Sequence, residues 1–381
     1  MCFQIFLKRP KDNYCVGVLQ VTDLPNLAMD FSMSFLKKIS GLFSPPRESN
    51  ISVRGQKVEF KVPRGQTILE SALHNGIAFP HDCKVGTCGA CKYRLVSGKI
   101  GELASSAMGL SGDLYQSGYR LGCQSIPKED LEIELDTVLG RAIVPKETRA
   151  LISGQKRLAH DIIELTVVPE NPVVFHPGQY ADIECSELSV VRSYSFSSPF
   201  QSEGSLSFHI RLVPGGVFSG WLFGHDRTGT TITLRGPYGQ FGLHESDTVM
   251  VCVAGGTGLA PIKCLLQSMT EIQRERVVLL FFGARQQRDL YCIDEIKALQ
   301  RDWIGRFELI PVLSEEPATS SWKGKRGMVT EHFQEFLQGH PCEGYLCGPP
   351  PMVDAAESEL LRLGVAREYI YADRFYNRPP V

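Results

Sequence analysis

The stretch His81-Asp82-Cys83-Lys84-Val85-Gly86-Thr87-Cys88-Gly89-Ala90-Cys91 decides the fold of the N-terminal part of this chain. Its cysteines have the spacing C-x4-C-x2-C, and a further cysteine follows in Leu121-Gly122-Cys123. This pattern is typical of a 2Fe-2S site, because thiolates are soft ligands that suit iron–sulfur centres. Gly86 and Gly89 allow the loop to aim backbone N–H groups at the sulfurs. The predicted metal ligands are Cys83, Cys88, Cys91 and Cys123.

A zinc site, or cysteines with only a structural role, is the alternative interpretation. Structural zinc usually has two close cysteine pairs, whereas the second half of this pattern supplies a single cysteine. The spacing therefore favours iron–sulfur. Lys84, Val85 and Thr87 are expected to be exposed around the loop and to face a partner protein.

Length and composition indicate an ordinary globular protein of two to three domains. The chain has 381 residues, of which 43% are hydrophobic and 22% charged. A net charge of −2 gives no argument for nucleic-acid binding. Of the 12 cysteines, those outside the predicted cluster are scattered without framework spacing, which predicts a reducing cytoplasm. No apolar run predicts a membrane span, and no signal peptide is recognisable.

The segment 1–50 is predicted to be an N-terminal extension followed by a short helix. Residues before Met33 show no clear period, and Met33 resembles a natural start. Apolar residues recur at helical spacing between residues 31 and 43, and Pro45-Pro46 ends the pattern. We expect this helix to dock on its own protein, with a membrane-surface helix as the alternative.

Residues 51–140 have the pattern of a small α+β domain. Residues 51–62 predict two short strands about Gly55, and further strands are expected at 93–96 and 131–135. Thr67-Ile68-Leu69-Glu70 is a capping box that begins a helix, which Asn75-Gly76 ends. With the cysteine loop, residues 51–136 resemble plant-type ferredoxins, and this resemblance implies a β-grasp-like fold.

Residues 146–243 predict an antiparallel β-barrel. After a connection at 137–148, strand signals at 162–167, 179–183, 206–213 and 230–234 are separated by turn residues. Alternation along Leu206–Leu212 places His209 and Arg211 on the face opposite the apolar side chains.

Residues 247–381 predict an α/β doubly wound parallel sheet. An apolar strand at 248–254 leads through Gly255-Gly256-Thr257-Gly258 into a helix, with Pro261 expected at its first position. Further buried strands are expected at 277–282, 307–312 and 345–347, with helical stretches between or after them.

A flavin-binding pattern lies in the predicted barrel. Arg192-Ser193-Tyr194-Ser195 follows the strand that begins at Pro177-Gly178-Gln179-Tyr180, and Arg211–Ser219 and Gly236–Phe241 come later. Together they resemble the ferredoxin–NADP reductase superfamily, which implies a six-stranded barrel that binds FAD. The resemblance implies that Arg192 pairs with the pyrophosphate, Tyr194 packs on the isoalloxazine and Ser195 bonds near N5. The predicted FAD ligands are Arg192, Ser193, Tyr194, Ser195, Arg211, Gly216, Val217 and Ser219.

The same resemblance identifies a pyridine-nucleotide site. The loop Ala254–Pro261 departs from G-x-G-x-x-G, because Pro261 replaces the third glycine. The resemblance places Cys347 and Gly348 of the C-G-P-P motif beside the nicotinamide. It places a C-terminal aromatic against the flavin, with Phe375 as the first candidate and Tyr376 as the second. Alternatively, Cys347 is a core thiol at the end of a strand, and Phe375 is a terminal residue that packs on the sheet. The predicted nucleotide-site residues are Gly256, Thr257, Gly258, Arg285, Gly348 and Pro349, and Ser195 and Cys347 are the predicted catalytic residues.

The residues after the strand at 307–312 favour NADH over NADPH. Glu315 and Glu316 would repel a 2′-phosphate. Arg285 and Arg288 are the residues that argue for NADPH, because either could reach a phosphate.

The order of the three units resembles the single-chain NADH reductases of bacterial oxygenases. Those reductases pass electrons from NADH through FAD and 2Fe-2S to an oxygenase, so this chain is predicted to be a ferredoxin–NAD(+) reductase-type enzyme. A closer resemblance, to electron-transfer components of xylene/toluene monooxygenases, implies a membrane-bound non-haem di-iron hydroxylase as partner, which oxidises toluene or xylene methyl groups. It implies a cytoplasmic protein, peripheral at the inner membrane through that partner. This resemblance rests on Met33–Phe43, His81–Cys91 and Asp373–Pro380.

Other interpretations remain open from the sequence. A reductase of a ring-hydroxylating dioxygenase, of a soluble monooxygenase or of deoxysugar biosynthesis has the same chemistry with another partner. A flavin and iron–sulfur redox sensor is the alternative from a different class. Rapid NADH-dependent reduction of cytochrome c would distinguish an enzyme from a sensor.

Overall fold

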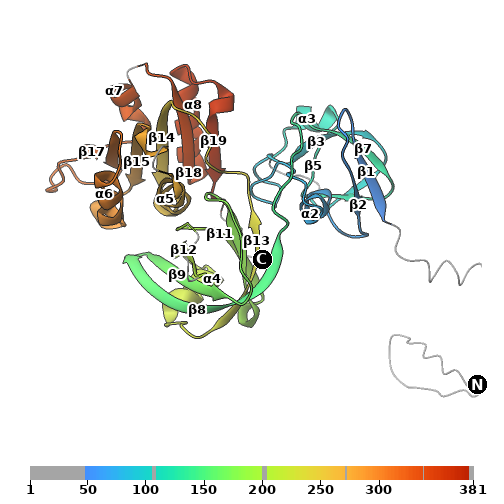
Figure 1. Ribbon diagram of the computed structural model, residues 1–381, viewed down its shortest axis with the longest axis horizontal. Coiled ribbons are helices and arrows are strands. Elements are labelled where there is room, and N and C mark those ends of the chain that lie inside the picture. The colour runs from blue at the N-terminus through green and yellow to red at the C-terminus, as the bar shows by residue number, and fades with distance from the viewer. Residues whose placement is uncertain (1–47, 105–108, 200–203, 271–272, 338, 377–381) are drawn as a thin grey trace, which may run out of the picture. The chain divides into compact units, whose positions relative to one another are not determined.

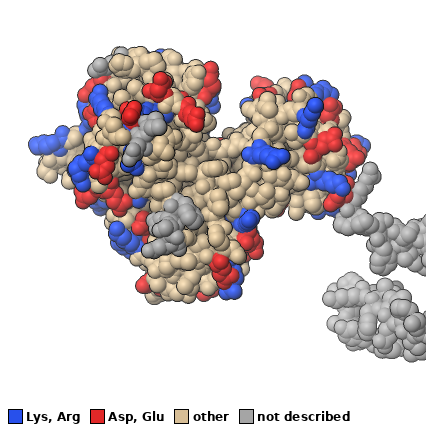
Figure 2. Space-filling model, in the orientation of Figure 1, with Lys and Arg blue, Asp and Glu red and all other residues tan. Residues whose placement is uncertain are grey.

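The computed structural model describes residues 48–104, 109–199, 204–270, 273–337 and 339–376. The helix expected at 31–43 and the start expected at Met33 lie outside these residues. None of the described helices is both long and apolar enough to cross a bilayer. Acidic and basic side chains are interspersed over the face seen in Figure 2.

The first sheet forms the α+β unit that the sequence predicts. Its strand order is β2-β1-β7-β3-β5, with β1 and β7 parallel and the other neighbours antiparallel. Helix α2 packs its apolar residues into the core of this sheet. The Thr67 side chain accepts the backbone N–H of Glu70 at 3.1 Å, as expected at a helix start. The elements are β1 (Ser49–Val53), β2 (Glu59–Val62), α2 (Ile68–His74), β3 (Lys92–Ser97), β4 (Ile100–Glu102), α3 (Gly112–Gln116), β5 (Tyr119–Leu121), β6 (Ser125–Pro127) and β7 (Leu131–Glu134).

The second sheet is a six-stranded antiparallel sheet with the order β11-β10-β13-β8-β9-β12. A bridge between Phe196 and Phe208 joins the two ends of this order, so the sheet curls into a barrel (Figure 1). Helix α4 places Phe218 and Leu222 in the barrel core. The elements are β8 (Lys146–Ala159), β9 (Ile162–Pro169), β10 (Tyr180–Cys185), η1 (Ser186–Leu188), β11 (Val190–Ser195), β12 (Leu206–Arg211), α4 (Val217–Gly224) and β13 (Thr231–Tyr238).

The barrel differs from its sequence prediction in two strands. Strand β8 begins inside the expected connection, and its register shifts between Ile152 and Gly154, which breaks the alternation that identifies a strand. Strand β11, which contains the flavin motif, was not predicted as a strand. His209 lies on the face opposite the apolar core side chains, as the alternation predicts, and it is buried there against Tyr291 of the third unit.

The third sheet is parallel throughout, with the order β17-β16-β15-β14-β18-β19. Side chains of β14 alternate between two cores, with Cys252 on the α5 and α6 side and Val253 on the α7 and α8 side. Helices α5, α6, α7 and α8 flank this sheet in Figure 1. This is the doubly wound arrangement that the sequence predicts. The elements are β14 (Val249–Gly255), η2 (Gly256–Gly258), α5 (Leu259–Ser268), η3 (Gln273–Glu275), β15 (Val278–Ala284), η4 (Gln287–Asp289), α6 (Ile293–Arg301), β16 (Phe307–Leu313), β17 (Lys325–Arg326), η5 (Val329–His332), α7 (Phe333–Leu337), β18 (Cys342–Gly348), α8 (Pro350–Arg362), η6 (Arg367–Tyr369) and β19 (Ile370–Arg374).

Helix α5 begins at Leu259, so Pro261 is its third residue and not its first. The domain limits predicted above remain predictions. Several cysteines outside the predicted cluster behave as small apolar residues: the buried ones are Cys185, Cys252, Cys264, Cys342 and Cys347.

Candidate redox centres and nucleotide site

The four predicted cluster cysteines lie together as two pairs. The thiol of Cys88 hydrogen-bonds Cys83, and the thiol of Cys91 hydrogen-bonds Cys123. The Cys88 thiol, together with backbone N–H groups, lowers the pKa of Cys83 to about 4. Two adjacent pairs of sulfurs are what a cluster of two irons requires, so these residues fit a 2Fe-2S centre.

Backbone amides point at the sulfurs, as the glycines of the loop predict. The N–H groups of Thr87 and Cys88 each lie 3.4 Å from Cys83 Sγ, and that of Ala90 lies 3.4 Å from Cys88 Sγ. Gly89 has φ +75° and packs against the chain, because a Cβ there would lie 2.3 Å from the Gly109 carbonyl oxygen. Such donors stabilise thiolates and tune a bound cluster.

The residues on either side of Cys83 contact the barrel. Lys84 Nζ lies 2.6 Å from Asp182 Oδ2, so Lys84 is not the exposed, partner-facing residue that the sequence predicted. The Tyr180 hydroxyl donates to the Asp82 carbonyl at 2.6 Å. The Gly239 N–H donates to His81 Nε2 at 3.1 Å, and burial lowers the pKa of His81 to about 4, so this nitrogen accepts as a neutral imidazole.

The flavin motif occupies β11, beside β10. Tyr194 packs on Phe218 of α4 with ring centroids 5.6 Å apart, and Ser195 is buried. The Ser193 hydroxyl donates to Asp182 Oδ1 at 2.6 Å. Within the described part of the chain, no carboxylate forms an ion pair with Arg192, whose Nη1 donates to the Val191 carbonyl at 2.8 Å. An arginine without a carboxylate partner fits an anionic ligand.

The loop before α4 supports the same interpretation. No described side chain caps the N-terminus of α4, and Val217 at its first position is 51% exposed. The Ser219 hydroxyl accepts the Val213 N–H at 3.1 Å and shapes the turn at Gly216. Free N–H groups at a helix start favour a pyrophosphate.

Three segments far apart in sequence meet at the nucleotide loop. A Cβ on Gly258 would lie 2.1 Å from the Cys347 carbonyl oxygen, so η2 and the end of β18 are in close contact. The Phe375 N–H donates to the Gly348 carbonyl at 2.9 Å. The Tyr291 hydroxyl donates to the Gly256 carbonyl at 3.0 Å. The predicted residues are therefore brought together; Thr257 is half-buried in η2 and Pro349 precedes α8.

Cys347 is fully buried, and burial raises its pKa well above the ordinary value. A neutral buried thiol shapes the loop and is not a nucleophile. Its catalytic assignment, like that of Ser195, stays a prediction.

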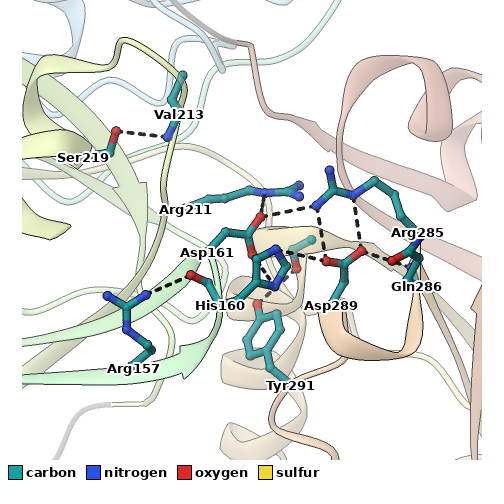
Figure 3. Close-up of polar contacts among 11 residues, drawn as sticks. Arg157, His160, Asp161, Arg211, Val213, Ser219, Arg285, Gln286, Asp289 and Tyr291 are labelled. Carbon is teal, nitrogen blue, oxygen red and sulfur yellow. Dashed lines mark hydrogen bonds and ion pairs between the residues drawn. The ribbon is translucent and has the colours of Figure 1, made fainter.

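Arginines and carboxylates form a network across the barrel and the third unit (Figure 3). Asp161 Oδ2 accepts Arg211 Nε at 2.8 Å and Arg285 Nη2 at 3.4 Å. Arg285 Nε lies 3.3 Å from Asp289 Oδ2, and His160 Nε2 lies 3.6 Å from Asp289 Oδ1. The carboxylates are neutralised by guanidinium groups, which argues against a metal ion here. Arg285, predicted on the ribose side, is already paired twice.

Glutamates occupy the turn after β16, as the sequence predicts. Glu316 accepts the Gln287 N–H at 2.9 Å, which lowers the pKa of Glu316. The Glu315 N–H donates to the Arg285 carbonyl at 2.8 Å. This turn therefore lies beside η4.

Sequence reasoning missed Asp182, Tyr180, Tyr291 and Asp161. Of these residues, only Asp182 could have been noticed in the sequence. It is a carboxylate in an otherwise apolar strand, and such a group usually has a partner. The other contacts join residues far apart in sequence and could be found only in the structure.

Four cysteines in two pairs, a barrel with a flavin motif and a parallel sheet with a Gly-rich loop define an iron–sulfur flavoprotein reductase. The chain matches the 2Fe-2S iron-sulfur cluster binding domain over residues 51–128. It also matches the oxidoreductase FAD-binding domain over 150–243 and the oxidoreductase NAD-binding domain over 252–358.

Curated relatives and solved structures agree with this class. The chain is 80% identical over 346 residues to the xylene/toluene monooxygenase electron transfer component XylA of Pseudomonas putida, covering 91% of this chain and 99% of the relative. It is 30% identical to the phenol 2-monooxygenase reductase component DmpP of Pseudomonas sp. strain CF600, covering 86% and 94%. The structure of the Amycolatopsis cytochrome P450 reductase GcoB aligns with TM-score 0.78 and 31% identity, covering 86% and 98%. The chain belongs to the family of electron-transfer reductase components of oxygenase systems.

When bound, NADH, FAD and the 2Fe-2S cluster would supply the conversion of a two-electron donation into single-electron transfers. The role of the protein's own residues is to bind and orient these groups. Tyr291 fixes the Gly256 carbonyl, and the contact between Gly258 and Cys347 fixes the loop against β18. The N–H groups of Thr87 and Cys88 would donate to Cys83 as a thiolate ligand of the cluster.

Proposed function

We propose that this protein passes electrons from NADH through FAD and 2Fe-2S to a membrane-bound non-haem di-iron hydroxylase that oxidises the methyl groups of toluene or xylenes. The 80% identity to a xylene/toluene monooxygenase electron transfer component, over 99% of its length, carries the proposal. The protein is cytoplasmic and reaches the inner membrane through this partner.

The cofactor sites proposed for this protein use the flavin motif, the first turn of α4 and the nucleotide loop. Arg192 and the first turn of α4 hold the FAD pyrophosphate, and Tyr194 and Phe375 border the flavin ring. The nucleotide is NADH, because Glu315 and Glu316 follow β16, while Arg285 is held by Asp161 and Asp289.

Reconstitution tests the partner. Purified holoprotein, NADH, oxygen and membranes that contain the hydroxylase should convert toluene to benzyl alcohol, and Cys88→Ser protein should not. Rapid NADH-dependent reduction of cytochrome c without any benzyl alcohol would reject the hydroxylase and leave the reductase activity intact. Parallel assays with a soluble phenol hydroxylase and a ring-hydroxylating dioxygenase would then identify the alternative partner.

A further inference from the structure

Lys84 has an unusual backbone conformation for its residue type. It directly follows the cluster cysteine Cys83 and has φ +56°, in the left-handed region. A non-glycine residue there costs roughly 1 kcal/mol, whereas glycine, as at Gly86 and Gly89, has no such cost. A lysine at this position therefore points to a use for its side chain.

The Lys84 side chain is enclosed by the barrel. Its Nζ lies 2.6 Å from Asp182 Oδ2, and the two side chains are only 16% and 12% exposed. The same Nζ lies 3.3 Å from the centre of the Tyr238 ring. A charge pair that is largely shielded from water, with an aromatic face beside it, is stronger than a surface ion pair.

Asp182 continues this contact into the flavin motif. It pairs with Ser193 across β10 and β11, and its other oxygen accepts the Ser193 hydroxyl at 2.6 Å. Lys84, next to the cluster ligand Cys83, is thus connected through Asp182 to Ser193 of the flavin motif. The hydrogen bond from Tyr180 to Asp82 runs beside it.

We propose that Lys84 is a positioning residue that holds the cysteine loop against the flavin-motif strand and thereby sets the rate of electron transfer from flavin to cluster. In this step the flavin loses one electron and the cluster gains it, and no covalent bond changes at Lys84. Transfer between such centres slows steeply with distance, so loosening this contact slows the step. The inference rests on the flavin site proposed above.

Two substitutions in the full-length holoprotein test the proposal. Lys84→Met keeps most of the stem and removes the charge, and Lys84→Gly removes the side chain while permitting the same φ. After rapid mixing with NADH, absorbance should show flavin reduction at the wild-type rate. Cluster reduction, followed by freeze-quench electron paramagnetic resonance, should slow by roughly tenfold to a hundredfold. Lys84→Arg should retain much of the wild-type rate.

A structural readout and a matched control complete the test. Small-angle X-ray scattering should give a larger radius of gyration for both disrupted variants. Arg54→Gln breaks an exposed ion pair of the first sheet, at 2.9 Å from Glu132, and should change neither rate nor radius. Lys84→Gly with full iron and sulfide content and wild-type cluster reduction would overturn the proposal. So would loss of the cluster in Lys84→Gly, because Lys84 would then act in assembly. Absence of flavin reduction in the wild type would instead refute the proposed flavin and nucleotide sites.

Discussion

Substitution of Gly258 by alanine should impair NADH binding. The added Cβ would lie 2.1 Å from the Cys347 carbonyl oxygen and 2.8 Å from the Gly348 nitrogen, and both are backbone atoms that a rotamer change cannot move. Relief requires the loop to shift away from β18, and overpacking of this kind costs about 1–3 kcal/mol. If that free energy is lost from the bound state, kcat/KM for NADH falls roughly 5- to 150-fold.

Stopped-flow reduction of the bound flavin at several NADH concentrations measures this loss. Gly112→Ala is the matched control, because a Cβ there meets nothing within 4 Å. Cluster content, from electron paramagnetic resonance of dithionite-reduced protein, should be the same in both variants. A Gly258→Ala protein whose kcat/KM stays within about twofold of wild type would refute the inferred packing of the loop.

Three further changes have expected outcomes. Cys88→Ser should abolish the cluster signal and transfer to cluster-dependent acceptors, while NADH still reduces the flavin; loss of flavin reduction as well would contradict the division of roles. Glu315→Gln should raise kcat/KM for NADPH by roughly tenfold, since a carboxylate no longer repels the 2′-phosphate, and an unchanged NADPH/NADH ratio would count against Glu315. Burial lowers the pKa of His209 below its ordinary value of 6.5. Below pH 6.5, His209 therefore becomes protonated in the unfolded chain before it does so in the folded protein. The free energy of unfolding then decreases by up to about 1.4 kcal/mol per pH unit, and His209→Gln should flatten this dependence in thermal unfolding midpoints.

The sequence predicted best where the chemistry is local. The cysteine loop could be recognised because three ligands lie within one short segment, whose glycines predict its wrapped backbone. The barrel was predicted less completely. Strand β8 has shifts of register against β9, and its exposed Lys156 and Arg157 interrupt the apolar pattern. Periodicity alone cannot identify such a strand.

Contacts between the units could not be predicted. Lys84 and Asp182 are 98 residues apart, and nothing in either local sequence indicates that they meet. Asp161 and Arg285 are 124 residues apart, and their pairing depends on how a barrel turn meets the end of β15. Arg285 was consequently interpreted as open to a phosphate, although two carboxylates hold it.

The buried cysteines give a way to observe cluster loss chemically. Burial raises the pKa of Cys252 and of Cys264 to about 12, so at neutral pH they carry almost no thiolate and should resist alkylation in the folded protein. Cys83 and Cys88 are half-buried and become available once iron is removed. Iodoacetamide followed by peptide mass spectrometry should therefore label the loop in native apoprotein and spare β14 and α5, which makes alkylation a quantitative assay of cluster occupancy.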